Sequence, residues 1–364
     1  MMRKYQKSIC VFVHELNRTG ASLVMYDAIS VMRQAGHGIM VISPIDGVLR
    51  DDYEKIGVQV FVLDEYCILI QESRSGKACD IALPIDSYIK IFNQIWCLTV
   101  VAAPIIKRYK NLNIPIVWWI HEGVAVLERY YRSMPKKLPD NVLTLVCSEY
   151  SSKVLKLYNF LYPVAVLHYG VKDEANNYKK KNDSKKFNFV MAGSLCPRKA
   201  QDILFEALHY VDNEVMVNSI FTIIGGGTNQ EYLDKIHALA DRYDNVRFIP
   251  NITREEVFSY YVNMDCLLCP SRDDPMPVVI SEAAMFSKPV ICSDFVGQAG
   301  YIEQANEEMV FKNLSPIELA KAINKIYYDG DLRKELGKYN RKIYEDQFAY
   351  ESMKRNVLQI VNNL

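Results

Sequence analysis

Two acidic residues, Asp274 and Glu282, flank an expected helix start and could bind hydroxyl groups. In the stretch 271–288, SRDDPMPVVISEAAMFSK, two prolines force the residues before them away from the α region, so an extended loop is expected. The pattern becomes helical at Val278, which leaves the backbone N–H groups of Val278 and Val279 at a helix N-terminus, a site suited to a diphosphate. Carboxylates beside such a site can accept hydrogen bonds from sugar hydroxyls.

Glycines mark two further turns between a strand and a helix. Gly20 follows the first expected strand, where a glycine lets backbone approach a ligand closely. The triple glycine 225–227 also follows a strand, but alone it is weak evidence because any tight turn could use it. The sequence contains no G-x-G-x-x-G run at either place, which argues against a dinucleotide-dependent dehydrogenase.

Alternating strands and helices must position these groups. Near-continuous apolar strands separated by helices indicate parallel sheets covered on both faces. In the first half, strands are expected at 8–13, 39–43, 58–63, 95–100, 115–120 and 142–147, with a helix at 21–34. In the second half, strands are expected at 187–192, 221–224, 246–249, 266–269 and 289–292, with helices at 201–209, 230–242, from 278 and at 316–328.

The chain is long enough for two domains. Its 364 residues exceed the ~250–300 at which one hydrophobic core stops growing. The run KDEANNYKKKNDSKK has no strong aliphatic side chain and cannot bury a core, so residues 173–186 are the expected linker between domains at 1–172 and 187–347. The last segment, 348–364, is expected to be a helix with one apolar face.

The composition favours an ordinary globular protein and excludes several classes. The 43 basic residues balance 43 acidic ones, which argues against a large nucleic-acid-binding face. The apolar runs at 9–13 and 95–106 are too short for a signal peptide and a membrane helix, so a cytosolic location is expected. Nine scattered cysteines are typical of reduced thiols. Cys266 and Cys269, three apart on an expected strand, point to opposite faces and are expected to pack in the core.

The loop that carries Asp274 resembles the signature of a known enzyme family. Ser271, Asp274, Glu282 and Ala283 fall on the S-x-x-E-x7-E-A pattern of the retaining glycosyltransferases of family four. The resemblance implies the α/β GT-B fold, in which two Rossmann-like βα domains face each other across a cleft. It also implies that the helix at 348–364 crosses back onto the first, acceptor-side domain. In the family the first acid, here the shorter Asp274, holds donor-sugar hydroxyls and the second, Glu282, holds the nucleotide ribose.

A second block, FVMAGSLCPRKAQD, resembles the family's G-R-x-x-x-x-K loop. Gly193 follows the strand and Lys199 stands six positions later. The resemblance implies that Lys199 lies against the donor diphosphate, where a fixed cation neutralises charge on the leaving group. Ser194 occupies the position of the family's arginine, and Arg198 could supply the missing charge. The alternative is a solvated Arg-Lys pair at a helix start.

The run WWIHEG ends the strand expected at 115–120 and resembles a family run whose histidine contacts the donor sugar. A lone histidine is more often structural, but the carboxyl end of a parallel strand favours function for His121. Glu122 is a weaker candidate that could orient the imidazole.

Three further residues match the nucleotide-binding part of the family pattern. Gly225 and Gly227 fall on its I-x-G-x-G turn near the nucleotide. Asn251 follows the strand at 246–249, where the family packs the nucleotide base against backbone.

The resemblance implies a retaining transferase that moves a hexose from a nucleotide-sugar, with a UDP-sugar as the expected donor, to a hydroxyl on a glycan, lipid or protein. Asp273 and Asp274 form no clear D-x-D metal site, so metal independence and no cofactor are expected. Two other readings remain. One is a nucleotide-sugar epimerase of the same fold. The other is a non-catalytic subunit of a two-component transferase, which Ser194 and Asp274 favour and Lys199, Glu282 and His121 oppose.

One surface stretch could contact a membrane. Residues 129–137, RYYRSMPKK, mix aromatic and basic side chains and could touch a membrane or a lipid-linked acceptor. A solvated helix end explains the same pattern better. The expected location is therefore cytoplasmic, and the alternative is a cytoplasmic protein that also contacts the inner face of the membrane peripherally.

Overall fold

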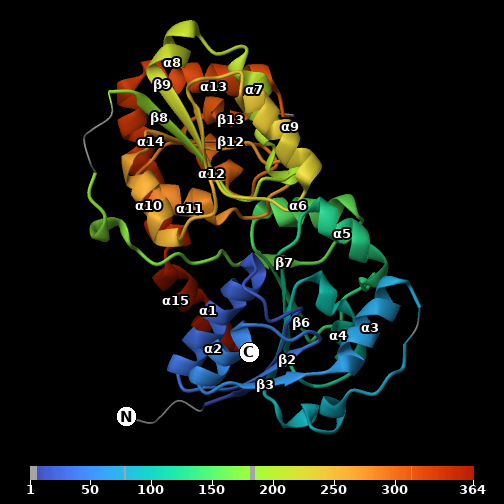
Figure 1. Cartoon of the computed structure of the whole chain (residues 1–364). Helices are drawn as coiled ribbons and strands as arrows, with labels where there is room; N and C mark the ends of the chain where they lie inside the picture. The colour runs from blue at the N-terminus through green and yellow to red at the C-terminus, as the bar shows by residue number, and fades with distance from the viewer. Residues whose placement is uncertain (1–5, 78, 181–184, 313) are drawn as a thin grey trace. The chain divides into compact units, whose positions relative to one another are not determined.

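The structure is a computed structural model that describes residues 6–77, 79–180, 185–312 and 314–364. The chain divides into two compact units (Figure 1). Unit 1 comprises Met1–Gly170 and Met353–Leu364, and unit 2 comprises Val171–Ser352. The division between them lies two residues before the expected end of the first domain. Residues 181–184 of the expected linker lie outside the described residues.

Unit 1 is built on a seven-stranded sheet in the order β3-β2-β1-β4-β5-β6-β7, and all its ladders are parallel. Its strands are β1 (Ser8–Phe12), β2 (Gly38–Ser43), β3 (Gln59–Val62), β4 (Gln94–Leu98), β5 (Ile116–Ile120), β6 (Val142–Val146) and β7 (Val164–Val166). Its helices are α1 (Gly20–Gln34), α2 (Leu49–Lys55), α3 (Asp64–Arg74), α4 (Ala103–Tyr109), α5 (Val124–Tyr130) and α6 (Glu149–Leu157).

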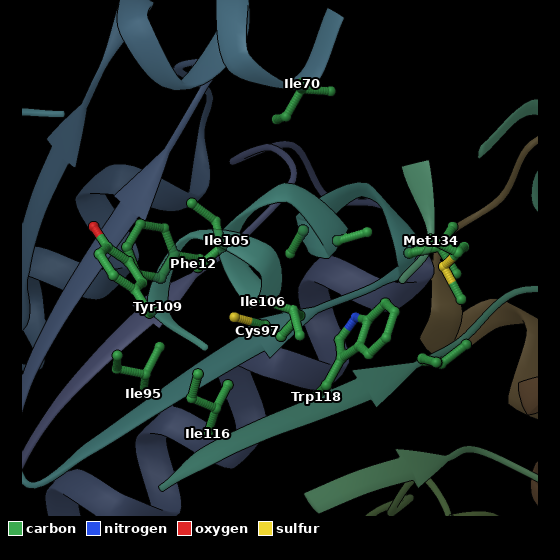
Figure 2. Close-up of a cluster of buried hydrophobic side chains, with 14 of the residues drawn as sticks. Phe12, Ile70, Ile95, Cys97, Ile105, Ile106, Tyr109, Ile116, Trp118 and Met134 are labelled. Atoms are coloured by element: carbon green, nitrogen blue, oxygen red, sulfur yellow. The ribbon is translucent and has the colours of Figure 1, made fainter. Parts of the chain in front are cut away.

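The core of unit 1 packs against the central strands. β4 and β5 are buried along their whole length because helices cover both faces of the sheet. Figure 2 shows Phe12 of β1 and Trp118 of β5 in one cluster with Ile105, Ile106 and Tyr109 of α4. The indole N–H of Trp118 donates to the carbonyl of Thr99 at 2.7 Å, so this large side chain is also satisfied as a donor.

Unit 2 is built on a six-stranded parallel sheet in the order β10-β9-β8-β11-β12-β13. Its strands are β8 (Phe187–Ala192), β9 (Ser219–Ile224), β10 (Val246–Ile249), β11 (Cys266–Cys269), β12 (Val290–Ser293) and β13 (Val310–Phe311). Its helices are α7 (Gln201–Leu208), α8 (Asn213–Asn218), α9 (Gln230–Ala240), α10 (Arg254–Asn263), α11 (Val278–Met285), α12 (Ala299–Ala305), α13 (Pro316–Tyr328) and α14 (Gly330–Ile343).

The prediction of two Rossmann-like α/β units with parallel sheets is confirmed. In each sheet the strand order reverses beside the first strand, so β1 and β4 are neighbours in unit 1 and β8 and β11 in unit 2. Loops that leave two such neighbouring strands diverge and form a crevice at their carboxyl ends. The two shortest strands, β7 and β13, have three and two residues and were not predicted.

The stretch expected to be a polar linker packs against unit 2 as far as residue 180. The ring of Tyr178 meets those of Phe258 and Phe286 edge-on, with centroids 5.6 and 6.0 Å away. Asp173 pairs with Arg341 of α14 at 2.5 Å. Tyr178 and Asp173 thus anchor this otherwise polar segment to unit 2.

The last helix, α15 (Tyr350–Asn363), begins two residues later than predicted and follows a π-helical turn at Tyr344–Phe348. Residues 353–364 belong to unit 1. There the carbonyl of Val361 accepts hydrogen bonds from Lys7 Nζ at 2.6 Å and Gln94 Nε2 at 2.7 Å. Among the helices of the described residues, none combines the length and apolarity required to cross a bilayer.

Candidate functional site

Lys199 and Asp274 meet at the carboxyl ends of the two central strands of unit 2. Lys199 lies in the loop after β8 and Asp274 in the loop after β11, and their Nζ and Oδ2 atoms are 2.5 Å apart. Both side chains are largely buried, with 14% and 9% of their surfaces exposed. The fold thus brings together two residues that the sequence pattern had singled out separately.

Arg198 adds a second cation to this pair. Its guanidinium donates to the carbonyl of Asp273 at 2.9 Å and lies 3.6 Å from Asp274 Oδ1. The Ser271 hydroxyl lies 3.5 Å from Asp274 Oδ2. Two cations around one carboxylate give this group of three side chains a net positive charge, which suits a polyanionic ligand.

A neighbouring ion pair, which the sequence analysis missed, holds the two loops together. Arg272 donates to both carboxylate oxygens of Asp202, at 2.8 and 3.1 Å, and to the carbonyl of Pro197 at 2.7 Å. Lys235 of α9 lies 3.1 Å from the same carboxylate. Burial alone raises the pKa of Asp202, but hydrogen bonds from Arg272 and Lys235 lower it to about 2. This pairing fixes the loop that carries Lys199 to the loop that carries Asp274.

The predicted glycines allow the loops after β8 and β9 to pack backbone against backbone. Gly193 and Gly225 have φ values of +141° and +139°, which side chains disfavour. A Cβ atom on Gly225 would overlap the carbonyl oxygen of Gly193, and one on Gly227 would overlap that of Leu195. The amide of Leu195 donates to the carbonyl of Gly226 at 2.8 Å. These glycines are needed for close loop packing, whatever they contact in a ligand.

The remaining two residues predicted for this region are solvent-exposed. Ser194 is exposed beside Gly193, and its carbonyl accepts a hydrogen bond from Gln201 at 3.0 Å. Asn251 is also exposed, and its side chain lies over Gly226, whose added Cβ would be 2.8 Å from the Asn251 amide nitrogen. Both remain available on the surface of unit 2.

Helix α11 begins where the sequence predicted. Pro277 is its N-cap residue, without a side-chain cap, and Val278 and Val279 form its half-buried first turn. The first amides of a helix have no intrahelical carbonyl acceptor and carry the positive end of the helix dipole. Asp274 precedes this turn and Glu282 follows it, as the spacing required.

Glu282 is paired with a cation that the sequence analysis did not consider. Nε of Arg254, a residue of α10, donates to Glu282 Oε1 at 2.9 Å, and Nη2 of the same guanidinium lies 2.7 Å from that oxygen. Burial raises the pKa of Glu282, and the charge and hydrogen bond of Arg254 oppose that shift. The Arg254 side chain is 56% exposed, whereas that of Glu282 is 7% exposed. The pairing therefore joins a buried carboxylate to an accessible surface cation.

In unit 1, His121 follows β5 and is enclosed by aromatic rings. Its Nδ1 atom lies 2.7 Å from the hydroxyl of Tyr169, whose ring stacks at 18° and 5.1 Å. Trp119 lies against it with a centroid distance of 4.6 Å. Burial, followed by the nearby charge of His14, lowers the pKa of His121 to about 3. The imidazole is therefore neutral at ordinary pH, and its buried Nε2 has no hydrogen-bond partner among the described residues.

Glu122 does not orient the imidazole, which corrects the sequence-based suggestion. Its Oε2 atom accepts the backbone N–H of His121 at 2.9 Å, while Tyr169 holds the ring. Burial raises the pKa of Glu122 to about 7, although N–H groups of His121 and Val100 favour the charged form. Tyr169 was missed because nothing in its local sequence points to the end of β5.

Gly20 is the first residue of α1 and is exposed. A Cβ atom added to it would find nothing within 4 Å, so packing does not require a glycine here. Gly20 and His121 thus belong to unit 1, and the other predicted site residues belong to unit 2.

The cysteines and acidic residues that the structure describes form no evident metal site. Cys266 and Cys269 are both buried in β11. Within the described ranges, no group of three or more His, Cys, Asp or Glu side chains is arranged to hold a metal ion.

Family models match both halves of the chain. Residues 172–343 match the model described as glycosyl transferases group 1, and residues 5–156 match glycosyl-transferase family 4. A D-inositol 3-phosphate glycosyltransferase of Streptomyces bingchenggensis is 27% identical over 41% of this chain and 34% of its own length. The O-antigen biosynthesis glycosyltransferase WclY of Escherichia coli is 23% identical over 92% of this chain and 97% of its own. The first curated relatives are matched over only about a third to a half of their lengths.

A solved structure shares the fold. The crystal structure of HepE from Anabaena in complex with UDP-glucose has a TM-score of 0.74 and 16% identity, and the match covers 99% of this chain and 100% of HepE. Together with the two parallel-sheet units, this similarity identifies the fold as GT-B. Because the two family models together span both units and the E-x7-E-like loop lies at the centre of the second, the chain belongs to the glycosyltransferases of group 1, family 4.

Proposed function

We propose that this protein transfers a hexose from a nucleotide-sugar to an acceptor hydroxyl with retention of anomeric configuration. The observation that carries the proposal is the cluster of Lys199, Arg198 and Asp274 beside the first turn of α11. Cations and unpaired helix amides at the switch point of a parallel sheet form an anion site suited to a diphosphate.

Each predicted site residue of unit 2 then has a role in donor binding. Lys199, Arg198 and the amides of Val278 and Val279 stabilise the charge that develops on the leaving diphosphate. Asp274 accepts hydrogen bonds from hydroxyls of the transferred sugar, and Glu282 from those of the ribose.

The neighbouring loops complete the donor site. Gly193 and Gly225 keep backbone close to the phosphates, and Gly227 with Asn251 flanks the base. We assign Ser194, exposed beside Gly193, to the same donor site. From unit 1, Gly20 and His121 contact the donor sugar.

The transfer needs no separate protein base. The bond between the anomeric carbon and the phosphate oxygen breaks, and the acceptor oxygen bonds to the same carbon on the same face. The acceptor proton passes to the leaving phosphate oxygen, so atoms and charge balance. Lys199 and Arg198 supply the positive charge that a metal ion would otherwise provide, so we propose that transfer proceeds without a metal.

A UDP-sugar is the donor we propose, because HepE has been crystallised with UDP-glucose, with UDP and glucose, and with UDP. The acceptor is a hydroxyl on a glycan, a lipid-linked sugar or a protein. We place the reaction in the cytoplasm, with peripheral contact at the inner face of the membrane through residues 129–137. There Arg132 lies over the Tyr131 ring, 5.6 Å from its centroid, which combines a base with an exposed aromatic side chain.

The second candidate is a non-catalytic subunit of a two-component transferase, which the shortened acid Asp274 and the uncharged Ser194 favour. An epimerase of the same fold is distinguished from both by its sugar product. In the transferase proposal, retained Lys199 and Glu282 make donor turnover the expected property.

The test is nucleotide release from UDP-, GDP- and ADP-sugars by the purified full chain in EDTA, without acceptor. Slow hydrolysis of one donor, with the sugar configuration unchanged and activity lost in Glu282→Ala, supports the transferase. Epimerised sugar supports the epimerase. An absence of both turnover and donor binding supports the partner subunit.

A further inference from the structure

The two ring nitrogens of His121 have different surroundings. Nδ1 lies 2.7 Å from Tyr169 Oη, whereas the buried Nε2 has no hydrogen-bond partner among the described residues. A neutral imidazole carries its proton on one nitrogen and accepts a hydrogen bond at the other. Whichever role Tyr169 takes at Nδ1 therefore decides what Nε2 can offer to a ligand.

We propose that Tyr169 is a positioning residue that donates its hydroxyl hydrogen to Nδ1 and thereby keeps the proton of His121 on Nε2. The Nε2–H group then donates a hydrogen bond to an oxygen of the transferred sugar. This inference rests on the proposed function and adds the residue that sets the chemistry of His121.

The aromatic enclosure also fixes the orientation of the ring. Tyr169 stacks on the imidazole at 18°, and Trp119 contacts it at 54° with a centroid distance of 4.6 Å. Trp119 and Tyr169 contact each other at 6.2 Å, so the three rings pack as one group. Within this group the imidazole can still flip, which would exchange its nitrogen and carbon positions. The hydrogen bond between Nδ1 and Tyr169 opposes this flip.

The surroundings of Tyr169 favour donation toward His121 over acceptance from it. An unprotonated imidazole nitrogen is a strong acceptor, whereas a thiol is a weak one. The Tyr169 hydroxyl also lies within hydrogen-bonding reach of the Cys147 thiol. Donation to Nδ1 therefore uses the stronger of these two acceptors, and a phenol O–H is a stronger donor than the N–H of a neutral imidazole. The Cys147 thiol has a further partner in the Ser151 hydroxyl, 3.3 Å away.

The charge state of His121 agrees with this arrangement. Burial lowers its pKa to about 3, so the ring is neutral and a single tautomer is meaningful at ordinary pH. The adjacent carboxylate, that of Glu122, uses Oε2 to accept the backbone N–H of His121. Tyr169 is therefore the group that selects the tautomer.

The test compares the full-length protein with Tyr169→Phe, which keeps the stacked ring and removes the hydroxyl. Tyr162→Phe is the matched control, because Tyr162 is another buried tyrosine of unit 1 whose hydroxyl donates to backbone, at Pro135. Long-range ¹H–¹⁵N correlation spectra report which imidazole nitrogen carries the proton, and the missing signal in His121→Ala assigns the residue among six histidines. We expect the Nε2–H form in the wild type and in Tyr162→Phe, and a mixture of both forms in Tyr169→Phe. A wild-type Nδ1–H form, or an unchanged spectrum in Tyr169→Phe, overturns the proposal.

Donor hydrolysis gives a second readout. Loss of one positioned hydrogen bond lowers kcat/KM for the donor by about tenfold in Tyr169→Phe, with little change in Tyr162→Phe. An expected tautomer with unaltered donor kinetics would overturn the positioning role. If the wild type turns over no donor, the proposed function fails, while the spectra still decide whether Tyr169 sets the tautomer.

Discussion

The ammonium of Lys199 lies 2.5 Å from a carboxylate oxygen of Asp274, although 75 positions separate the two residues in the chain. The sheet explains this proximity, because Lys199 follows β8 and Asp274 follows β11, and these strands pair directly. Arg198 lies 3.6 Å from the same carboxylate, and the first turn of α11 begins four residues after Asp274. Donor binding as proposed depends on the proximity of Lys199 and Asp274.

Removing the Lys199 ammonium tests its assigned role. Lys199→Ala is expected to lower donor turnover by roughly 10²–10³-fold, because a preorganised charge facing the leaving group is lost. Lys334→Ala is the control, since Lys334 also pairs with an acid of unit 2, Asp331, but is 76% exposed. Steady-state rates of the two variants, both checked for folding by circular dichroism, decide the matter. Equal rates would remove Lys199 from the mechanism.

The close packing of the glycine loops predicts a stability difference between two glycine substitutions. Gly225→Ala is expected to destabilise unit 2 by about 2–4 kcal/mol, because its Cβ meets the Gly193 carbonyl and its φ is +139°. Gly300 lies in the first turn of α12, and a Cβ atom added there would have open space around it. We therefore expect Gly300→Ala to be neutral or to stabilise the protein by up to about 1 kcal/mol. Urea denaturation of both variants measures the contrast. Similar stabilities would mean that the loops relax apart without cost.

The Asp202–Arg272 pair predicts acid sensitivity. The folded pKa of Asp202, about 2, lies below the unfolded value of ~3.9, so the folded state binds fewer protons between these values. Its contribution is present above about pH 4 and is lost as the pH falls toward 2. Asp202→Asn should therefore cost about 1–3 kcal/mol at pH 7 and flatten the acid limb of the stability curve. Asp331 is highly exposed, so Asp331→Asn is expected to change the free energy of unfolding by no more than about 0.5 kcal/mol, both at pH 7 and on the acid limb.

For Glu122 we expect the opposite dependence of stability on pH. Its folded pKa of about 7 lies above the unfolded value of ~4.3, so the folded state binds more protons and stability decreases as the pH rises between these values. Glu122→Gln mimics the protonated acid and should remove this decrease, which makes the variant more stable than the wild type at pH 8. Denaturation between pH 5 and 8 tests it, with the exposed Glu128→Gln as control. A wild-type slope that survives in Glu122→Gln would assign it to another group.

Local patterns predicted the elements and the candidate residues, but long-range pairings could not be predicted. Apolar runs located β4 and β5 because both are buried along their length, and the proline-rich loop located the start of α11. Arg254 gave no local signal, because its pairing with Glu282 depends on how α10 packs beside α11.

Tyr169 and Glu122 show the same limit in unit 1. Glu122 adjoins His121 in sequence, yet Tyr169, 48 positions away, holds the ring. Sequence adjacency favoured the wrong partner because backbone geometry directs the Glu122 carboxylate to an amide.

The most direct test of the central claim is calorimetric binding of UDP to the full chain in EDTA. The wild type is expected to bind UDP, and Lys199→Ala and Glu282→Gln are each expected to weaken binding by at least about tenfold, a loss of roughly 1.4 kcal/mol. Lys334→Ala is expected to bind as the wild type does. Equal affinity in all four proteins, or binding of none of UDP, GDP and ADP by the wild type, would contradict the assignment of this cluster as the nucleotide-sugar site.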